Sequence, residues 1–328
     1  MKAKLALFVA AASLWAGAAA AQPHDMSKMK GMGMGLPPMP AIYSGQADKP
    51  GAPVFGNLGD HSMKIAASPE AQTFFDQGVR LVFGFNHAEA IRSFREAARL
   101  DPECAMCWWG VSFALGSNIN LPMQDDAIIP AWMALQHAQA LAPKASPKEQ
   151  AWIAALGKRY AESKTADRAQ LNTAFAAAMG ELAEQYPDDV DVLTFWAESM
   201  MDTQPWDYWE ADLKTPKGNG AAIVATLEKV MQMSPSHPGA LHLYIHAVEA
   251  STTPERAEVA ADRLLTLMPA AGHIVHMPSH IYYRVGRYAD AAAANEKAAQ
   301  VDEDYIAACR AQGFYPAGYY GHNIHFLW

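Results

Sequence analysis

The sequence predicts an all-α protein, an α-solenoid of about six helical hairpins followed by an incomplete seventh. Apolar and small residues recur in a frame of about 34 residues, the length of one helix-turn-helix repeat. No run of strand length alternates polar with apolar residues. Hydrophobic residues make up 51% of the chain and charged residues 18%, so one elongated array can bury a sizeable core.

The first hairpin gives the clearest frame. Its small and apolar residues have the spacing of two packed helices: Phe74, Gly78, Leu81, Ala90, Phe94, Ala97 and Pro102. Small side chains at Gly78, Ala90 and Ala97 let the two helices approach closely, and Pro102 ends the second helix. This spacing resembles that of tetratricopeptide (TPR) repeat proteins. The resemblance implies that the first helix of each hairpin lines a concave groove.

The later hairpins keep the frame less strictly, and prolines again close their second helices. These prolines are Pro143, Pro187, Pro235 and Pro269. The second hairpin is lengthened by a loop at 116–126, and the polar, glycine-bearing stretch 215–220 interrupts the fourth. A sixth hairpin carries its turn near 286–291. We therefore expect the solenoid at residues 67–303.

Residues 304–328 are expected to begin a further repeat whose partner helix is missing. The half-hairpin would expose apolar side chains such as Ile324 and Phe326, whereas the terminal repeats of such arrays carry polar surfaces. This predicts that the chain is truncated relative to a longer protein.

The N-terminus has the three-part layout of a secretory signal peptide, expected at residues 1–21. Lys2 and Lys4 precede an apolar run at 5–15, and four alanines at 18–21 form a cleavage site. The run is too short for a membrane span, so the mature chain is expected to be secreted or periplasmic; an uncleaved anchor is the alternative. Residues 22–66 are rich in Gly, Pro, Met and Ser, which predicts a flexible arm.

The charge pattern argues against nucleic acid as a partner. Loss of the leader removes two lysines and no acids, which moves the net charge from −9 to about −11. The chain has no cluster of Lys and Arg that could bind phosphates.

Seven of the twelve histidines lie between His242 and His325, in three groups spaced for helix faces. They are His242, His246, His273, His276, His280, His322 and His325. Residues three, four and seven positions apart share one helix face, and the repeat frame puts these faces on the groove. Neutral imidazoles beside the carboxylate of Glu249 suit a transition metal. Two alternatives stay open: histidines that only hydrogen-bond across a packed groove, and a proton-transfer groove without metal.

Two residues are candidates for catalysis beside such a metal. Glu249 would act as a ligand or general base, and Tyr283 would polarise a substrate. Pro278 lies between His276 and His280, where it either kinks the helix or marks its first turn.

The expected arm tilts the metal prediction slightly toward copper over zinc or iron. It carries one histidine and five methionines within a short stretch: His24, Met26, Met29, Met32, Met34 and Met39. Thioether sulfur is a soft ligand that favours Cu(I). A low-complexity linker is the alternative interpretation of the same residues.

The pair Cys104 and Cys107 forms a CxxC motif. Trp108 follows it instead of a histidine, which excludes c-type haem attachment. In an oxidising compartment the pair is expected to form a disulfide, with a redox or soft-metal pair as the alternative. The aromatic loop at 202–209 is expected to form either a lid at the edge of the groove or ordinary core.

Several motifs also resemble those of a poorly characterised group of bacterial exported TPR-like proteins. The motifs lie at 104–110, 205–209, 242–246 (HxxxH), 276–280 (HMPSH) and 322–325 (HNIH). The resemblance covers most of the mature chain, and members of the group look longer at the C-terminus, but it implies no particular activity.

Two functions therefore compete at the level of sequence. The first is a transition-metal site in a histidine-lined groove, in a protein that is a candidate metalloenzyme. The second is a TPR scaffold that binds a protein or peptide without metal. Peptide-binding grooves present Lys, Arg and Asn, whereas this groove is expected to present His, Glu, Tyr and Cys.

Overall fold

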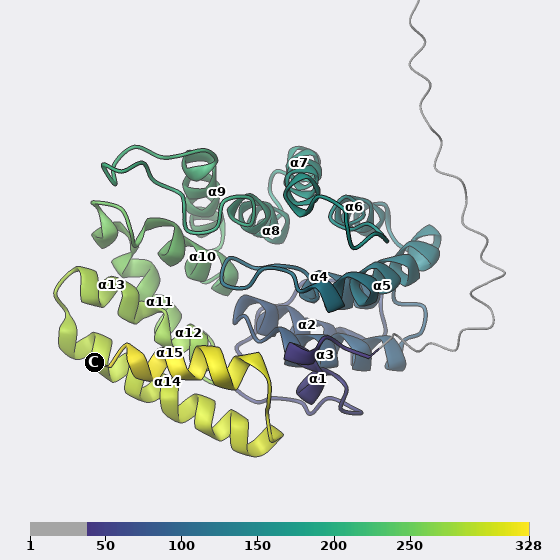
Figure 1. Cartoon of the computed structure of the whole chain (residues 1–328), viewed down its shortest axis with the longest axis horizontal. Coiled ribbons are helices and arrows are strands. Elements are labelled where there is room, and N and C mark those ends of the chain that lie inside the picture. The colour runs from purple at the N-terminus through teal and green to yellow at the C-terminus, as the bar shows by residue number, and fades with distance from the viewer. Residues whose placement is uncertain (1–37, 328) are drawn as a thin grey trace, which may run out of the picture. The chain divides into compact units, whose positions relative to one another are not determined.

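The computed structural model describes residues 38–327, and the chain is all-α over that range (Figure 1). The predicted fold class is thus confirmed, and no β-strand occurs among these residues. The signal peptide expected at 1–21, the part of the arm at 22–37 and Trp328 lie outside the described residues. None of the described helices is both long and apolar enough to cross a membrane.

The helices follow one another with short connections. In chain order they are α1 (Ala41–Ala47), α2 (Pro69–Phe83), α3 (His87–Leu100), α4 (Ala105–Ala114), α5 (Ile128–Leu141), α6 (Pro147–Leu156), α7 (Arg168–Gln185), α8 (Val190–Met201), α9 (Gly220–Met233), α10 (Pro238–Val248), α11 (Glu258–Leu267), α12 (Gly272–His276), α13 (Pro278–Arg284), α14 (Tyr288–Cys309) and α15 (Gly321–His325). From α2 on, each helix packs on the next one along the chain, and α10 also contacts α2, α8 and α13. The pairs α2–α3 through α10–α11 coincide with the first five predicted hairpins.

Local sequence signals explain where the helices begin. Ser68 accepts a hydrogen bond from the backbone N–H of Ala71 and precedes a proline in the first turn of α2. Ser146 and Glu149 form a capping box at the start of α6. Each cap satisfies backbone donors that the first helical turn leaves without a partner.

Close helix approach in the first two hairpins depends on glycine, as the repeat frame predicts. The ring of Phe94 on α3 lies between Gly78 on α2 and Gly110 on α4. A Cβ at Gly78 would lie 2.4 Å from that ring and one at Gly110 would lie 2.5 Å from it, so neither position has space for a side chain.

The sequence predicts a flexible arm at residues 22–66, but the part of this segment from residue 38 on is packed against the helices. Met39 and Tyr43 are buried, and the side chain of Gln46 on α1 hydrogen-bonds to Glu89 on α3. A segment without periodicity can still be ordered when its few apolar side chains find a core and its polar groups find partners.

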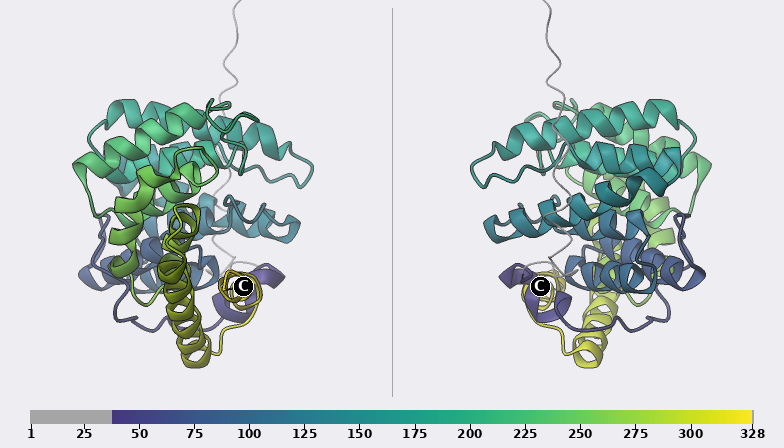
Figure 2. Two further views of the ribbon diagram at one scale, coloured as in Figure 1. Left: turned by 90° about the vertical axis from the view of Figure 1, so that its left-hand side faces the viewer. Right: turned by 90° about the vertical axis from the view of Figure 1, so that its right-hand side faces the viewer.

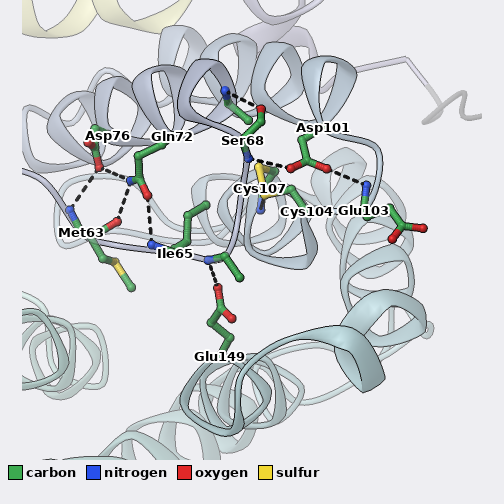
Figure 3. Close-up of a disulfide and its surroundings, with 12 residues drawn as sticks. Met63, Ile65, Ser68, Gln72, Asp76, Asp101, Glu103, Cys104, Cys107 and Glu149 are labelled. Carbon is green, nitrogen blue, oxygen red and sulfur yellow. Dashed lines mark hydrogen bonds between the residues drawn. A yellow bond between two sulfur atoms is a disulfide. The ribbon is translucent and has the colours of Figure 1, made fainter.

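The stretch before α2 is held by side chains of the helices around it (Figure 3). Glu149 Oε1 accepts from the backbone N–H of Ala66 at 2.6 Å, and Gln72 Oε1 accepts from that of Ile65 at 3.0 Å. Close by, Cys104 and Cys107 form a disulfide at the start of α4, one of the two forms expected for this pair.

The C-terminal part of the chain contacts its N-terminal part. The long helix α14 ends on the side of the protein where α1 lies (Figure 2). There the ammonium of Lys49, just after α1, donates to the carbonyls of Cys309 and Arg310 at 2.7 and 2.9 Å. A left-handed turn at Arg310 and Gly313 reverses the chain. A π-helical segment, Tyr315–Tyr320, then leads directly into α15. Residues 304–309, which the sequence assigned to a further repeat, form the end of α14, and the chain after the turn is helical from Tyr315 to His325.

Candidate metal centre

Two groups of three histidines come together in the described structure, five of them buried and His322 exposed. The first group is His242, His246 and His273, and the second group is His276, His280 and His322. Within each group, one ring nitrogen per residue lies within 4.8 Å of the others. Six of the seven histidines predicted from helix spacing thus fall into two sets of possible ligands.

Three separate segments bring these side chains together. Helix α10 presents His242 and His246 one turn apart, and α15 supplies His322. The other three come from α12 and α13, which are divided at Pro278. The proline therefore marks the first turn of a new helix, which is one of the two predicted possibilities.

The ring of His242 in the first group is fixed by the backbone of α2. Its Nδ1 donates to the carbonyl of Phe83 at 2.6 Å, because a carbonyl can only accept. The proton therefore sits on Nδ1, and Nε2 keeps a lone pair. Phe85, in a left-handed conformation just after α2, packs its ring against His242 and His273.

Glu249, the residue after the end of α10, binds one histidine of each group. Its Oε1 accepts from Nδ1 of His246 at 3.1 Å, and its Oε2 accepts from Nδ1 of His280 at 2.6 Å. Both rings thus carry their proton on Nδ1 and turn Nε2 away from the carboxylate. This is the carboxylate–histidine arrangement that orients imidazole ligands in metal sites.

His276 is fixed in the same way from α14. Its Nδ1 lies 2.5 Å from Oδ1 of Asn295, whose amide nitrogen donates to the carbonyl of Ala291 at 2.8 Å. The amide orientation follows from that second bond, so Oδ1 accepts and His276 Nδ1 donates. Four histidines therefore carry a proton on Nδ1, and the neutral form of each has Nε2 unprotonated.

The Nε2 atoms of these rings lack ordinary partners. Those of His242 and His246 are buried and, within residues 38–327, have no hydrogen-bond partner; both ring nitrogens of His273 are in the same situation. Nε2 of His276 lies 2.9 Å from Nε2 of His280. When one of these two rings carries a second proton, this distance is an ordinary N–H···N hydrogen bond. When both rings are neutral, two lone pairs face each other, an unfavourable contact that a shared cation relieves.

Burial favours the neutral form of five of these histidines, because it lowers their pKa. It lowers the pKa of His242, His273 and His276 well below the ordinary value, and the neighbouring imidazoles lower it further. Burial also lowers the pKa of His322 to about 4. Neutral imidazole is the form that binds metal ions.

Glu249 is ionised in this setting. Burial by itself would raise the pKa of its carboxyl, but the facing imidazoles of His280 and His246 outweigh that effect and hold the pKa below its usual range. The carboxylate thus brings one negative charge beside both groups.

A cavity of about 280 Å³ opens onto both groups. Each group contributes two histidines to its lining, and the remaining lining residues are Asn120, Trp206, Phe314, Gly318 and Tyr319. Trp206 packs against the ring of His246 at a centroid distance of 5.0 Å and donates its indole N–H to the carbonyl of Ile119. The aromatic loop at 202–209 thus supplies one side of the cavity, as one of its two sequence interpretations predicted.

Asp302 holds the segment that carries His322. It accepts from the hydroxyl of Tyr315 at 3.0 Å and from the amide of Asn323 at 2.7 Å, and burial raises its pKa to about 7. Asp302 is on α14, so these bonds fix α15 against that helix. The sequence contains no periodic signal that predicts this contact.

Four predicted site residues take other positions. His325 is exposed and belongs to neither histidine group. Tyr283 is 60% exposed and packs against Tyr288, and it is not among the cavity-lining residues. The disulfide of Cys104 and Cys107 likewise lies outside both groups.

A third polar group, which the sequence did not single out, consists of His61, Asp191 and His237. The hydrogen bonds among these three residues explain why they lie together. Asp191 Oδ1 accepts from Nε2 of His61 at 2.9 Å and lies 3.3 Å from Nε2 of His237. Nδ1 of His237 caps α10 by accepting from the N–H of Ala240. These contacts tie the 38–66 segment to α8 and α10.

No protein-family model matches the chain, and no curated protein matches it either.

Proposed function

We propose that this protein binds transition-metal ions through the histidines of the first and second groups. The observation that supports this most directly is the set of four imidazoles that donate from Nδ1 to fixed acceptors. Nε2 of His242 and of His246 is buried without a protein partner among the described residues, and Nε2 of His276 and of His280 have only each other. Buried polar atoms normally have partners, and an ion bound to these nitrogens would supply them.

The ligand set suits borderline metals rather than Mg²⁺ or Ca²⁺, which prefer oxygen. Copper is the proposed ion, ahead of zinc and iron. The support is the neutral imidazole set together with the Met-rich stretch of the sequence. Three protein ligands with a face open to a cavity are typical of catalytic sites, whereas structural sites are closed by a fourth ligand. The proposal therefore extends to a metalloenzyme, in an exported TPR-like protein that is secreted or periplasmic.

The alternative, a peptide-binding scaffold, has less support. The lining of the cavity consists of histidine, aromatic residues, Asn120 and Gly318, and none of these is a lysine or arginine that would bind a peptide carboxylate.

The experiment is metal analysis of protein purified without an affinity tag, after copper, zinc and iron supplementation in separate cultures. Wild type is expected to hold stoichiometric metal, and a His246→Ala/His276→Ala double variant is expected to lose it. His325→Ala and His61→Ala are matched controls, because each removes a histidine outside both groups, and both are expected to keep the metal. Wild-type protein without stoichiometric metal under all three conditions would overturn the proposal.

A further inference from the structure

We propose that the two groups hold two metal ions as one dinuclear centre, and that a small anion with an oxygen or nitrogen donor atom bridges the ions on the side of the cavity. This inference rests on the proposed function and adds to it the number of ions, their coupling and the class of ligand.

The spacing between the groups supports a single centre. Rings of different groups face one another with centroids 5.7 Å apart for His246 and His280, and 5.8 Å apart for His273 and His276. Metal–imidazole bonds are about 2.0–2.1 Å long, and paired ions in proteins lie about 3.5–4 Å apart. Two ions bound to these neighbouring rings are therefore near enough to share a ligand.

Glu249 links the ligand sets of the two ions. One carboxylate oxygen fixes His246 of the first group and the other fixes His280 of the second. A movement of this side chain changes a ligand of both ions. The two sites are consequently coupled through one side chain that is only 15% exposed.

Charge indicates the class of the bridging ligand. Imidazole binds a metal as a neutral ligand, and Glu249 is a carboxylate that contacts two of the six rings, His246 and His280. Two divalent ions would therefore leave a large uncompensated positive charge in a buried site, which is costly. A bridging anion such as hydroxide or azide reduces that charge.

The open coordination positions lie on one cavity. His246 and His273 of the first group and His280 and His322 of the second all line it. Its volume of about 280 Å³ exceeds the roughly 150 Å³ that hold a benzene. A bridging anion thus leaves space for an organic molecule of about one ring beside the aromatic side chains of Trp206 and Tyr319.

The test is titration of metal-free, full-length protein with Cu(II), followed by electron paramagnetic resonance (EPR) and then by azide addition. We expect two copper ions per chain, and an EPR signal from the second equivalent that is broadened or lost through spin coupling. Azide is expected to bind at one molecule per two copper ions, seen in the azide-to-copper absorption band. A His242→Ala/His273→Ala variant is expected to bind one ion with a full, unbroadened signal.

The outcomes separate the two proposals. Two ions with undisturbed signals of isolated spins, or one azide per copper, would overturn the dinuclear centre and leave metal binding intact. Binding of a single ion by wild-type protein would also overturn the dinuclear centre and leave metal binding intact. Absence of copper binding in correctly folded protein would overturn both proposals.

Discussion

Replacement of Glu249 by glutamine is expected to weaken both metal ions at once. The carboxylate offers an acceptor to Nδ1 of His246 and another to Nδ1 of His280. An amide has one acceptor and one donor, so Glu249→Gln leaves one of the two Nδ1–H groups without an acceptor and removes the negative charge from both. Loss of such a partner costs about 10- to 100-fold in metal affinity, or about 1.4–2.7 kcal/mol per ion.

Asn295→Ala is the matched comparison. Asn295 accepts only from His276, so this variant is expected to weaken the ion of the second group and to leave that of the first group unchanged. The assay is competition with a chromophoric chelator at pH 7, with circular dichroism to show that each variant is folded. Unchanged affinity in folded Glu249→Gln, or equal weakening of both ions by Asn295→Ala, would refute the reasoning.

The remaining predictions concern stability and the disulfide. Gly78→Ala places a methyl group against the ring of Phe94 and is expected to lower the unfolding free energy by about 1–3 kcal/mol in urea denaturation; an unchanged midpoint would contradict the packing. Burial lowers the pKa of His87 to about 4, and the charge of Arg159 lowers it further. The unfolded chain therefore binds this proton at a higher pH than the folded chain, and the free energy of unfolding falls as the pH drops from about 6.5 toward 4. His87→Phe should flatten this part of the pH profile by up to about 3 kcal/mol, and an identical slope in wild type and variant would argue against it. Cys104→Ser/Cys107→Ser opens a short loop and is expected to cost about 2 kcal/mol with metal content unchanged; loss of metal from a folded variant would place the disulfide in the site.

Much of the fold follows from the periodicity of the sequence. The small residues of the first hairpin predict the close approach of α2 and α3, and Pro102 and Pro143 predict the ends of α3 and α5, because both features depend on local residue types. The packing of residues 38–66 could not be predicted in this way. That segment is ordered by single long-range bonds, such as the one from Ala66 to Glu149, which leave no periodic pattern.

The histidine groups were likewise only partly predictable from the sequence. Helix spacing places His242 with His246 and His276 with His280, since residues one turn apart share a face. Spacing alone also groups His325 with His322 and Tyr283 with His280, but His325 and Tyr283 belong to neither group. Helix position and exposure do not separate them, because His322 shares the last turn of α15 with His325 and is exposed as well.

Two of the groups that orient the ligands lie far from the histidine motifs in the sequence. The carbonyl of Phe83 lies 159 positions from His242, and Asn295 lies 19 positions from His276. Neither belongs to a motif, and a backbone carbonyl carries no sequence signal. Their role depends on the three-dimensional arrangement of α2, α10, α12 and α14.

The central claim is that ions bind to the inward Nε2 atoms of the two histidine groups. The most direct test is a crystal structure of the copper-loaded protein with diffraction data collected on both sides of the copper absorption edge. The account predicts two anomalous peaks, one about 2 Å from Nε2 of histidines in each group. Peaks only at His61, Asp191 and His237, at His325, or nowhere in copper-loaded crystals would contradict it.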